Sequence, residues 1–457
     1  MMKRLIALLL TALMITAVLS ACGAKEEDLT DTSDTAPAKS SSATLDSNAA
    51  SKAESPTSAA NTGNTKSAQS GEVVTTAAVT SDGAIDASDI FSERDLRQTA
   101  DLSEAEEYTL SDNNDITITK AGVYVISGSA NNASVIVEAA DDDKVQLVFN
   151  GASITNTSTP AVYVKNADKV FITTVEDTTN EMTVSGAFTA DGNTNTDAVI
   201  FSKDDVVLNG LGTLNINSSD NGISGKDDVK ITGGTINITS ASDSIEANES
   251  IAVADGTITI KTDKDGLHAE NDEDNATGYV YICGGTFNIT AASDGIQATT
   301  IAQIDDGNLT IDAAEGIEAT WVQINGGTVN ITASDDGINA TSKSTAQSVK
   351  IEINGGDITV NMGQGDTDGL DSNGDLYING GTVSINANSP FDYDGKGELN
   401  GGTVTVNGEQ TTELTNQFMG GGPGGGMGGD PQMGGNPQMG NPPDKGSAPG
   451  VGGGFNR

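Results

Sequence analysis

The chain has 457 residues, of which 65 are acidic and 22 are basic, so its formal net charge is −43. A surface this acidic repels nucleic acid and does not bind a polyanion unless cations assist, so we expect no nucleic-acid partner. Aromatic residues make up only 4% of the chain, which disfavours an aromatic platform for stacking sugar rings.

The N-terminus has the features of a secretory signal. Lys3 and Arg4 precede a short apolar run, and small residues follow it. The run ends in Leu19-Ser20-Ala21-Cys22, which resembles a bacterial lipobox. This resemblance implies that residues 1–21 are a lipoprotein signal peptide and that Cys22 is diacylated. We therefore expect a lipid-anchored protein on the extracellular face of a bacterial membrane; the alternative is an ordinary signal with a chance cysteine.

Two segments have too few large apolar residues to form a core. Residues 22–84 are rich in Ser, Thr and Ala, and residues 417–457 are rich in Gly, Pro and Met. Such compositions bury too little apolar surface to offset the entropy of ordering the chain. We predict a disordered tether and a disordered tail on either side of a domain at residues 85–416.

The first part of this domain contains apolar segments at irregular spacing, typical of strands, up to about Asn217. Residues 89–105 precede the first of them, at Ile116–Ile118. A stack of strands must cover its terminal layer. We therefore predict a short helix within 89–105 that caps the N-terminal end.

From Asp220 onward a phrase of acid, Gly, aliphatic, polar and small residue recurs at a nearly fixed interval, with three short strand patterns in each period. The aliphatic positions are Ile223, Ile245, Leu267, Ile296, Ile317, Ile338 and Leu370. A second aliphatic series interleaves with it: Ile231, Val253, Ile282, Ile304, Ile324, Ile353, Ile378 and Leu399.

Short strands and Gly turns at this period indicate a solenoid, in which each coil buries its apolar side against the next. The spacing predicts an all-β fold, a right-handed parallel β-helix with about 21 to 22 residues per coil, in which both aliphatic series point inward. Leucine-rich repeats have a similar period, but their Leu/Asn spacing and any helical periodicity are absent here. Gly would recur where φ is positive or where backbones approach closely.

The run from Leu110 to Tyr124, together with Asp143–Leu147 and Asn150–Ile154, resembles the opening of a family of clostridial surface proteins. That family is known as a carbohydrate-binding domain with a polysaccharide-lyase-like β-helix, reported to bind cellulose and acidic pectic polymers and to hold calcium. The resemblance covers about residues 85–412. It implies a polysaccharide ligand and bound Ca²⁺.

The acids of the repeated phrase offer the clearest site. In a parallel sheet, equivalent residues of successive coils lie about 4.8 Å apart, and two carboxylates at that separation repel by roughly 1 kcal/mol in water and more where water is excluded. Calcium, which prefers oxygen ligands, would remove this repulsion. The predicted ligands are Asp243, Glu246, Asp265, Asp294, Glu315, Glu318, Asp335, Asp336, Asp366, Asp368 and Asp371. The alternative is a solvated acidic edge that limits aggregation.

Two further features have structural alternatives. His268, the sole histidine, could be a base or a ligand, but we expect a tolerated, exposed substitution in the acidic series. Columns of Thr and Asn, such as Thr257 with Thr286 and Asn288 with Asn330, could donate hydrogen bonds to a ligand, although ladders that stabilise the stack are the more common role.

These features favour a monomeric, non-catalytic, calcium-dependent protein that binds cellulose, acidic pectic polymers or both. One alternative is a calcium-dependent pectate-type lyase, which needs a Lys or Arg base beside the ion. No arginine lies between Arg97 and Arg457, so that base would be a lysine such as Lys264, and no lyase motif can be matched. A second alternative is a structural adhesin.

Overall fold

The computed structural model describes residues 83–271, 274–363 and 367–416. The predicted signal peptide, Cys22, the tail and nearly all of the tether lie outside these ranges. Asp366, one of the predicted calcium ligands, lies outside them as well.

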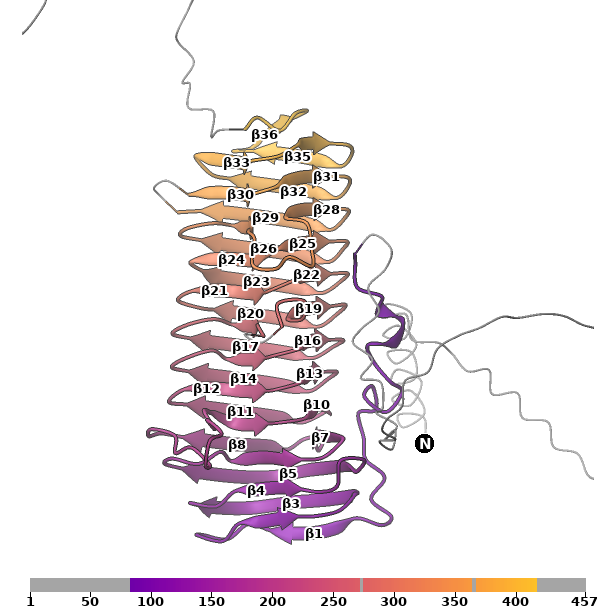
Figure 1. Ribbon diagram of the computed structural model, residues 1–457, viewed down its shortest axis with the longest axis vertical. Coiled ribbons are helices and arrows are strands. Elements are labelled where there is room, and N and C mark those ends of the chain that lie inside the picture. The colour runs from indigo at the N-terminus through magenta and orange to yellow at the C-terminus, as the bar shows by residue number, and fades with distance from the viewer. Residues whose placement is uncertain (1–82, 272–273, 364–366, 417–457) are drawn as a thin grey trace, which may run out of the picture. The chain divides into compact units, whose positions relative to one another are not determined.

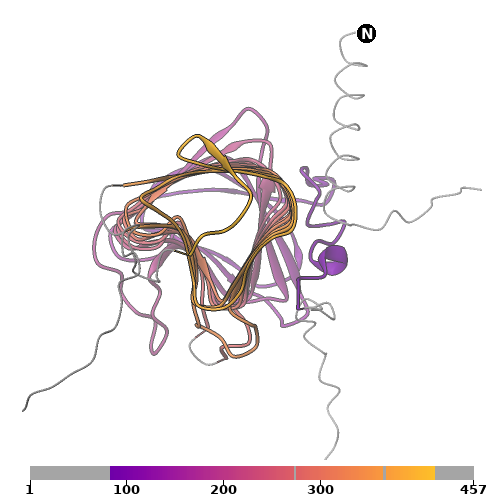
Figure 2. The same ribbon diagram turned by 90° about the horizontal axis from the view of Figure 1, so that it is seen from above.

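The described chain winds into coils whose strands form three stacks (Figures 1 and 2). The first stack is a 12-stranded sheet: β2 (Ile116–Ile118), β4 (Val135–Glu138), β6 (Val162–Asn166), β9 (Ala198–Ser202), β12 (Asn221–Gly225), β15 (Ile245–Ala247), β18 (Leu267–Ala269), β21 (Asp294–Ala298), β24 (Glu315–Ala319), β27 (Ile338–Ala340), β30 (Asp368–Ser372) and β33 (Ser389–Tyr393).

The second and third stacks belong to one 24-stranded sheet. The second stack contains β7 (Lys169–Thr174), β10 (Asp205–Gly210), β13 (Asp228–Ile231), β16 (Ser250–Val253), β19 (Tyr279–Ile282), β22 (Ile301–Ile304), β25 (Trp321–Ile324), β28 (Lys350–Ile353), β31 (Asp375–Ile378) and β34 (Gly397–Leu399). The third contains β8 (Thr179–Val184), β11 (Thr213–Ser218), β14 (Thr235–Ser240), β17 (Thr257–Thr262), β20 (Thr286–Thr290), β23 (Asn308–Ala313), β26 (Thr328–Ala333), β29 (Asp357–Met362), β32 (Thr382–Asn386) and β35 (Thr403–Val406).

The two ends of the sheet differ from its middle. At the N-terminal end, β1 (Glu106–Thr109) pairs with the long strand β3 (Gly122–Asn131), and β3 pairs with β5 (Lys144–Asn156), which contacts both β7 and β8. At the other end, β36 (Glu409–Thr411) turns back to pair antiparallel with β35. The other pairings between strands of the described residues are parallel, so the predicted all-β parallel β-helix is confirmed.

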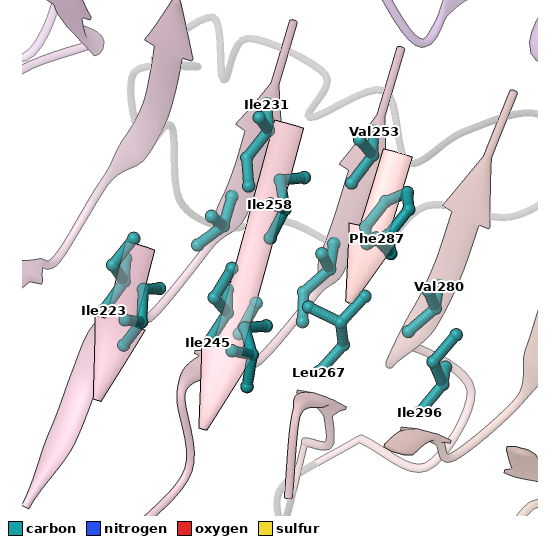
Figure 3. Close-up of a cluster of buried hydrophobic side chains, with 14 of the residues drawn as sticks. Ile223, Ile231, Ile245, Val253, Ile258, Leu267, Val280, Phe287 and Ile296 are labelled. Carbon is teal, nitrogen blue, oxygen red and sulfur yellow. The ribbon is translucent and has the colours of Figure 1, made fainter. Parts of the chain in front are cut away.

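The core is built from the two predicted aliphatic series. Ile245 pairs with Leu267, and Leu267 pairs with Ile296, each 0–1% exposed. Figure 3 shows these side chains pointing into the interior together with Ile258 and Phe287 of the third stack. The predicted inward orientation is therefore confirmed. Third-stack strands such as β17 alternate buried and exposed residues, whereas second-stack strands such as β22 are buried on both faces because the strap covers them.

The recurring glycines meet two different requirements. At Gly316, a Cβ atom would lie 2.3 Å from the carbonyl oxygen of Gly337 in the next coil, so the coils could not stack as closely with any side chain there. Gly327, in the turn before β26, has φ +81°, a conformation that L side chains rarely adopt.

The segment 83–98 lies along the outer face of the second stack, and we call it the strap (Figure 1). Ile85, Ile90 and Phe91 pack against Tyr281 and Trp321. Polar contacts hold it along its length: Ile85 N donates to Gln303 Oε1 at 2.8 Å, Lys230 Nζ to Ile90 O at 2.9 Å, and Gln98 Nε2 to Thr232 O at 2.8 Å.

The predicted capping helix within 89–105 is wrong. Only the three-residue 3₁₀ helix η1 (Ala87–Asp89) forms nearby, and the chain after it extends along the flank. The adjacent apolar residues Ile90 and Phe91 do not have the spacing that would put them on one face of an α-helix, and both are buried by the strap arrangement. Within the described ranges, no helix is long and apolar enough to cross a membrane.

Candidate functional site

The predicted acidic series lies at the corner where strands of the third stack end and those of the first stack begin. We call this corner the acidic edge. Asp294 pairs with Glu315, and three residues further on Gln297 pairs with Glu318. The edge has two columns: Asn221, Asp243, Asp265, Asp294, Glu315, Asp336 and Asp368, and beside it Ser224, Glu246, His268, Gln297, Glu318, Asn339 and Asp371.

The first column has a structural role that the sequence did not reveal. Asp243 Oδ1 accepts a hydrogen bond from the backbone N–H of Asp265 at 3.0 Å, and Asp265 Oδ1 accepts from Asp294 N at 2.9 Å. Asp336 Oδ1 likewise accepts from Asp368 N at 3.2 Å. One oxygen of each of these carboxylates therefore links its coil to the next. This link explains why the acid recurs at the same position of every coil, and it leaves the second oxygen for other contacts.

At Asp243 the second oxygen is already matched by cationic side chains. Asp243 Oδ2 lies 2.8 Å from Lys264 Nζ and 3.1 Å from His268 Nδ1. Burial raises the pKa of Asp243, but hydrogen bonds from His268 and Lys264 outweigh it and lower the pKa to about 2. Burial lowers the pKa of His268, yet Asp243 and Asp265 raise it above its ordinary value overall.

His268 is therefore not the exposed substitution that we expected. Its side chain is buried, and its Nε2 atom lies 3.0 Å from Glu270 Oε2. Among the described residues, Asp243, Asp265 and His268 form the one group of three His, Cys, Asp or Glu side chains whose possible ligand atoms all lie within 4.8 Å of one another. Because Lys264 also neutralises this group, it suits calcium less well than the sequence suggested.

Further along the edge the carboxylates have few cationic partners. Burial, with the charges of Asp265 and Glu315, raises the pKa of Asp294 to about 8. Burial raises the pKa of Glu315 to about 7, although a hydrogen bond from Asn339 opposes the increase. Burial and Asp371 raise the pKa of Asp336 to about 7.

Two other acids complete this section. Burial and the nearby Asp392 and Asp368 raise the pKa of Asp371 to about 6. Glu318 does have cationic help, because Lys343 Nζ lies 2.6 Å from its Oε2 atom. We call the following set the anionic section: Asp294, Glu315, Glu318, Asp336, Asn339 and Asp371.

Asn339 gives this section a buried amide oxygen without a hydrogen-bond partner among the described residues. It is 9% exposed and lies between Glu318 and Asp371 in the second column. Its Nδ2 atom donates to Glu315 Oε2 at 2.9 Å, whereas its buried Oδ1 atom has no hydrogen-bond partner among the described residues. A buried acceptor without a partner costs about 1 to 3 kcal/mol, so its retention here requires an explanation.

The other predicted ligands are placed less favourably. Asp335 is exposed, and Asp368 is half-buried beside Thr367. Glu246 is occupied by hydrogen bonds from Asn221 Nδ2 at 2.9 Å and Ser224 Oγ at 3.0 Å. Asn339 is not among the predicted ligands, although its place in the second column marks it from the sequence as an oxygen donor beside the acids.

The large aromatic residues do not offer a sugar-stacking surface in this conformation. Trp321 is 1% exposed and Tyr281 0%, and both are covered by the strap. A ligand would have to be held by hydrogen bonds or through cations.

Comparison with known proteins identifies relatives. The sequence model of the carbohydrate-binding domain-containing proteins matches residues 112–366 and 317–412. A protein of this description from Acetivibrio thermocellus is 34% identical over 122 residues, which are 26% of this chain and 43% of that protein. The chain thus spans less than half the length of this relative.

One solved structure is also similar, that of a polysaccharide lyase-like protein from C. thermocellum, determined as a gadolinium derivative. The similarity has a TM-score of 0.42 at 25% sequence identity, and it covers 57% of this chain and 98% of that one. The family match itself covers more than half of the present sequence. This protein therefore belongs to the family of carbohydrate-binding domain-containing proteins.

Proposed function

We propose that this protein is a surface-anchored, calcium-dependent polysaccharide-binding protein that does not cleave its ligand. The observation that carries the proposal is the anionic section, where carboxylates with raised pKa values occupy the same coils as Asn339, whose buried Oδ1 atom has no hydrogen-bond partner among the described residues. Family membership supports the carbohydrate ligand.

The residues of the anionic section fit calcium. Ca²⁺ takes six to eight oxygen ligands at about 2.3 to 2.6 Å, from carboxylates, amide carbonyls and water. Glu315, Asp336, Asp371 and the Asn339 amide oxygen are all oxygen donors, and a bound cation would favour the ionised form of each carboxylate. These residues would hold the ion once their side chains turn toward one another, because among the described residues only Asp243, Asp265 and His268 already bring three such ligand atoms within 4.8 Å. Asp294 and Glu318 would extend the site toward the preceding coil.

A calcium ion at this edge would give an acidic protein a means of binding an acidic polymer. The net charge of −43 opposes a polyuronate such as pectate, because like charges repel. A divalent ion held by the protein can accept a carboxylate of the polymer as a further ligand, so chelation should abolish binding. Hydrogen bonds would serve a neutral polymer such as cellulose.

The protonation of Lys264, the candidate base, argues against the lyase alternative. Burial lowers the pKa of Lys264, but its hydrogen bond to Asp243 raises it more, so the pKa lies above the ordinary value. An ammonium group held in this way does not accept a proton at neutral pH. Incubation with polygalacturonate and calcium should therefore give no rise in ultraviolet absorbance from unsaturated products. A steady rise that Lys264→Ala abolishes would establish the lyase instead.

Anchoring at the cell surface is proposed from the sequence, with Cys22 as the acylated residue. The competing use of the Cys22 sulfur is a disulfide with Cys283, the other cysteine of the chain. Mass measurement of the N-terminal peptide, before and after reduction, distinguishes the two. A diacylglyceryl group supports the anchor, and a peptide released by reduction refutes it.

Calcium titration by calorimetry tests the central proposal. The mature protein should bind calcium with measurable heat and bind pectate only while calcium is present. Glu315→Gln with Asp336→Asn should weaken both. A control with two exposed acids removed elsewhere, Asp142→Asn with Glu176→Gln, has the same charge change and should behave as wild type. Equal heats of calcium binding in the wild type, the double variant and the control would mean that the acidic edge is a solvated surface and holds no calcium.

A further inference from the structure

The outer side of the third stack is a continuous surface of exposed and half-buried side chains, most of them short and polar. Strands β17, β20, β23, β26, β29 and β32 pair in register and lie one above another (Figure 1). Their inward residues, such as Ile258, Phe287 and Leu309, fill the core, which fixes the alternate residues outward. We call the outward side chains of these strands the Thr/Asn face.

The Thr/Asn face consists of three rows that run along the axis of the β-helix. The first row is Thr257, Thr286, Asn308, Thr328, Asp357 and Thr382; the middle row is Thr259, Asn288, Thr310, Asn330, Thr359 and Ser384; the third row is Lys261, Thr290, Asp312, Thr332, Asn361 and Asn386.

The middle row has free hydrogen-bonding groups where a stabilising ladder would have none. In the preceding coils Asn237 Nδ2 donates to Asn215 Oδ1 at 2.8 Å, and Asn215 Nδ2 donates to Glu181. Thr259 and Asn288, by contrast, are exposed, and neither side chain is hydrogen bonded to another described residue. The same holds for Thr310 and Asn330. In the middle row the expected ladder role thus applies to the N-terminal coils and stops at β17, whereas in the third row Asn386 Nδ2 still donates to Asn361 Oδ1 at 2.8 Å.

The charge of this face differs from that of the molecule. Its charged members are Lys261, Asp312 and Asp357, in a chain whose net charge is −43. An uncharged polymer meets little repulsion here, because the face has no row of carboxylates, whereas a polyuronate would meet two carboxylates and a single lysine. The face is therefore complementary to a neutral ligand that is rich in hydroxyl groups.

Successive coils repeat about every 4.8 Å along the axis, which is close to the advance per sugar of an extended β-1,4-linked glycan. A chain lying along the rows would therefore present one sugar to each coil. Each sugar could exchange hydrogen bonds with one Thr or Asn of the middle row. A chain lying across the rows would meet only the side chains of one or two coils.

We infer that the Thr/Asn face binds an uncharged, extended β-linked glycan parallel to the β-helix axis, with one sugar per coil and without calcium. The inference deepens the proposed polysaccharide-binding function and rests on it. It assigns neutral and acidic polymers to different surfaces, which are adjacent because the acidic edge begins where the strands of this face end. Thr262, the last residue of β17, precedes Asp265 by only two intervening residues.

The test combines one variant with two ligands. Thr259→Val, Asn288→Val, Thr310→Val and Asn330→Val together remove the hydrogen-bonding groups of the middle row and keep side chains that favour strands. Retention of the mature protein on microcrystalline cellulose should fall at least tenfold, with or without chelator. Calcium-dependent retention on pectate should stay within twofold of wild type. The control Thr117→Val with Thr119→Val, two exposed threonines elsewhere, should change neither.

A second variant distinguishes loss of glycan binding from loss of folding. Thr310→Asp adds one carboxylate at an exposed position in the centre of the face and should also reduce cellulose retention at least tenfold, with an unchanged circular dichroism spectrum. Cellulose retention within twofold of wild type in both variants would overturn the inference, as would wild-type protein that does not bind cellulose. Neither result affects the calcium titration, so failure here is distinct from failure of the calcium proposal.

Oligosaccharide length tests the orientation. If the chain lies along the axis, affinity for soluble β-1,4-glucans should rise with every sugar from three to six, since each added unit reaches another coil. Affinity that stops rising at about three sugars would show a chain lying along a strand, where only three rows are available, and would overturn the axial assignment.

Discussion

Without calcium, the domain should lose stability as the pH rises from 5 to 8. The carboxyls responsible are Asp294, Glu315, Asp336 and Asp371, whose pKa values are raised to between about 6 and about 8. Their unfolded values lie near 4. Between the two sets of values the folded state holds more protons than the unfolded chain, so the free energy of unfolding falls as the pH rises.

The magnitude follows from these shifts. One pKa unit corresponds to 1.36 kcal/mol, so the shift of Glu315 from 4.5 to about 7 would correspond to about 3 kcal/mol if it were fully buried. These groups are partly open to solvent, and screening reduces each contribution to about 1 kcal/mol. The four together should lower the stability by about 4 kcal/mol, which is a fall in Tm of about 6 °C for a domain of this length.

The assay is thermal and urea unfolding at pH 5, 6.5 and 8 in buffers freed of calcium with a chelating resin, repeated with saturating calcium. Calcium should abolish most of the decrease, because it binds the ionised carboxylates, and should add roughly 3 to 4 kcal/mol at 100 to 1,000 times its dissociation constant. The increase should be largest at low salt, where repulsion is least screened.

A matched pair of variants separates this effect from the general repulsion of an acidic chain. Neutralising the four carboxyls as amides should flatten the pH dependence. Neutralising four exposed acids elsewhere should leave it unchanged: Glu104, Asp142, Glu176 and Glu398. Stability in calcium-free buffer that is constant or rises between pH 5 and 8 would refute the reasoning.

Three other outcomes are expected. Ile317→Ala should lower the free energy of unfolding by about 2 to 5 kcal/mol, because a 0% exposed side chain leaves a cavity between coils; urea unfolding measures this, and a change below 1 kcal/mol would contradict it. Ile85→Asp should detach the end of the strap and shift the emission of Trp321, the sole Trp, to longer wavelength; an unchanged spectrum would mean that the strap is not needed to cover it. Cys22→Ala should release the protein from the membrane fraction, and continued lipid labelling would count against the anchor.

The repeat in the sequence was sufficient to predict most of the fold. Period-two alternation and regular spacing place Ile223, Ile245 and Leu267 in one inward column because, in a solenoid, neighbours in space are neighbours by period. Register follows from the same rule, so the stacking of Asp294 on Glu315 could also be predicted. These are local regularities that each coil repeats.

The remaining features depend on the strap, which is distant in sequence from the strands it covers, and on how far individual side chains reach between coils; the period encodes neither. The strap lies on the second stack because Ile90 and Phe91 find Tyr281 there, far along the chain. Lys264 and His268 reach Asp243 from the next coil, and this contact neutralises one part of the acidic edge and leaves the other anionic. The sequence alone therefore determined which residues stack. Only the tertiary structure decided which stacked carboxylates have a cationic partner, because that depends on where individual side chains reach across coils.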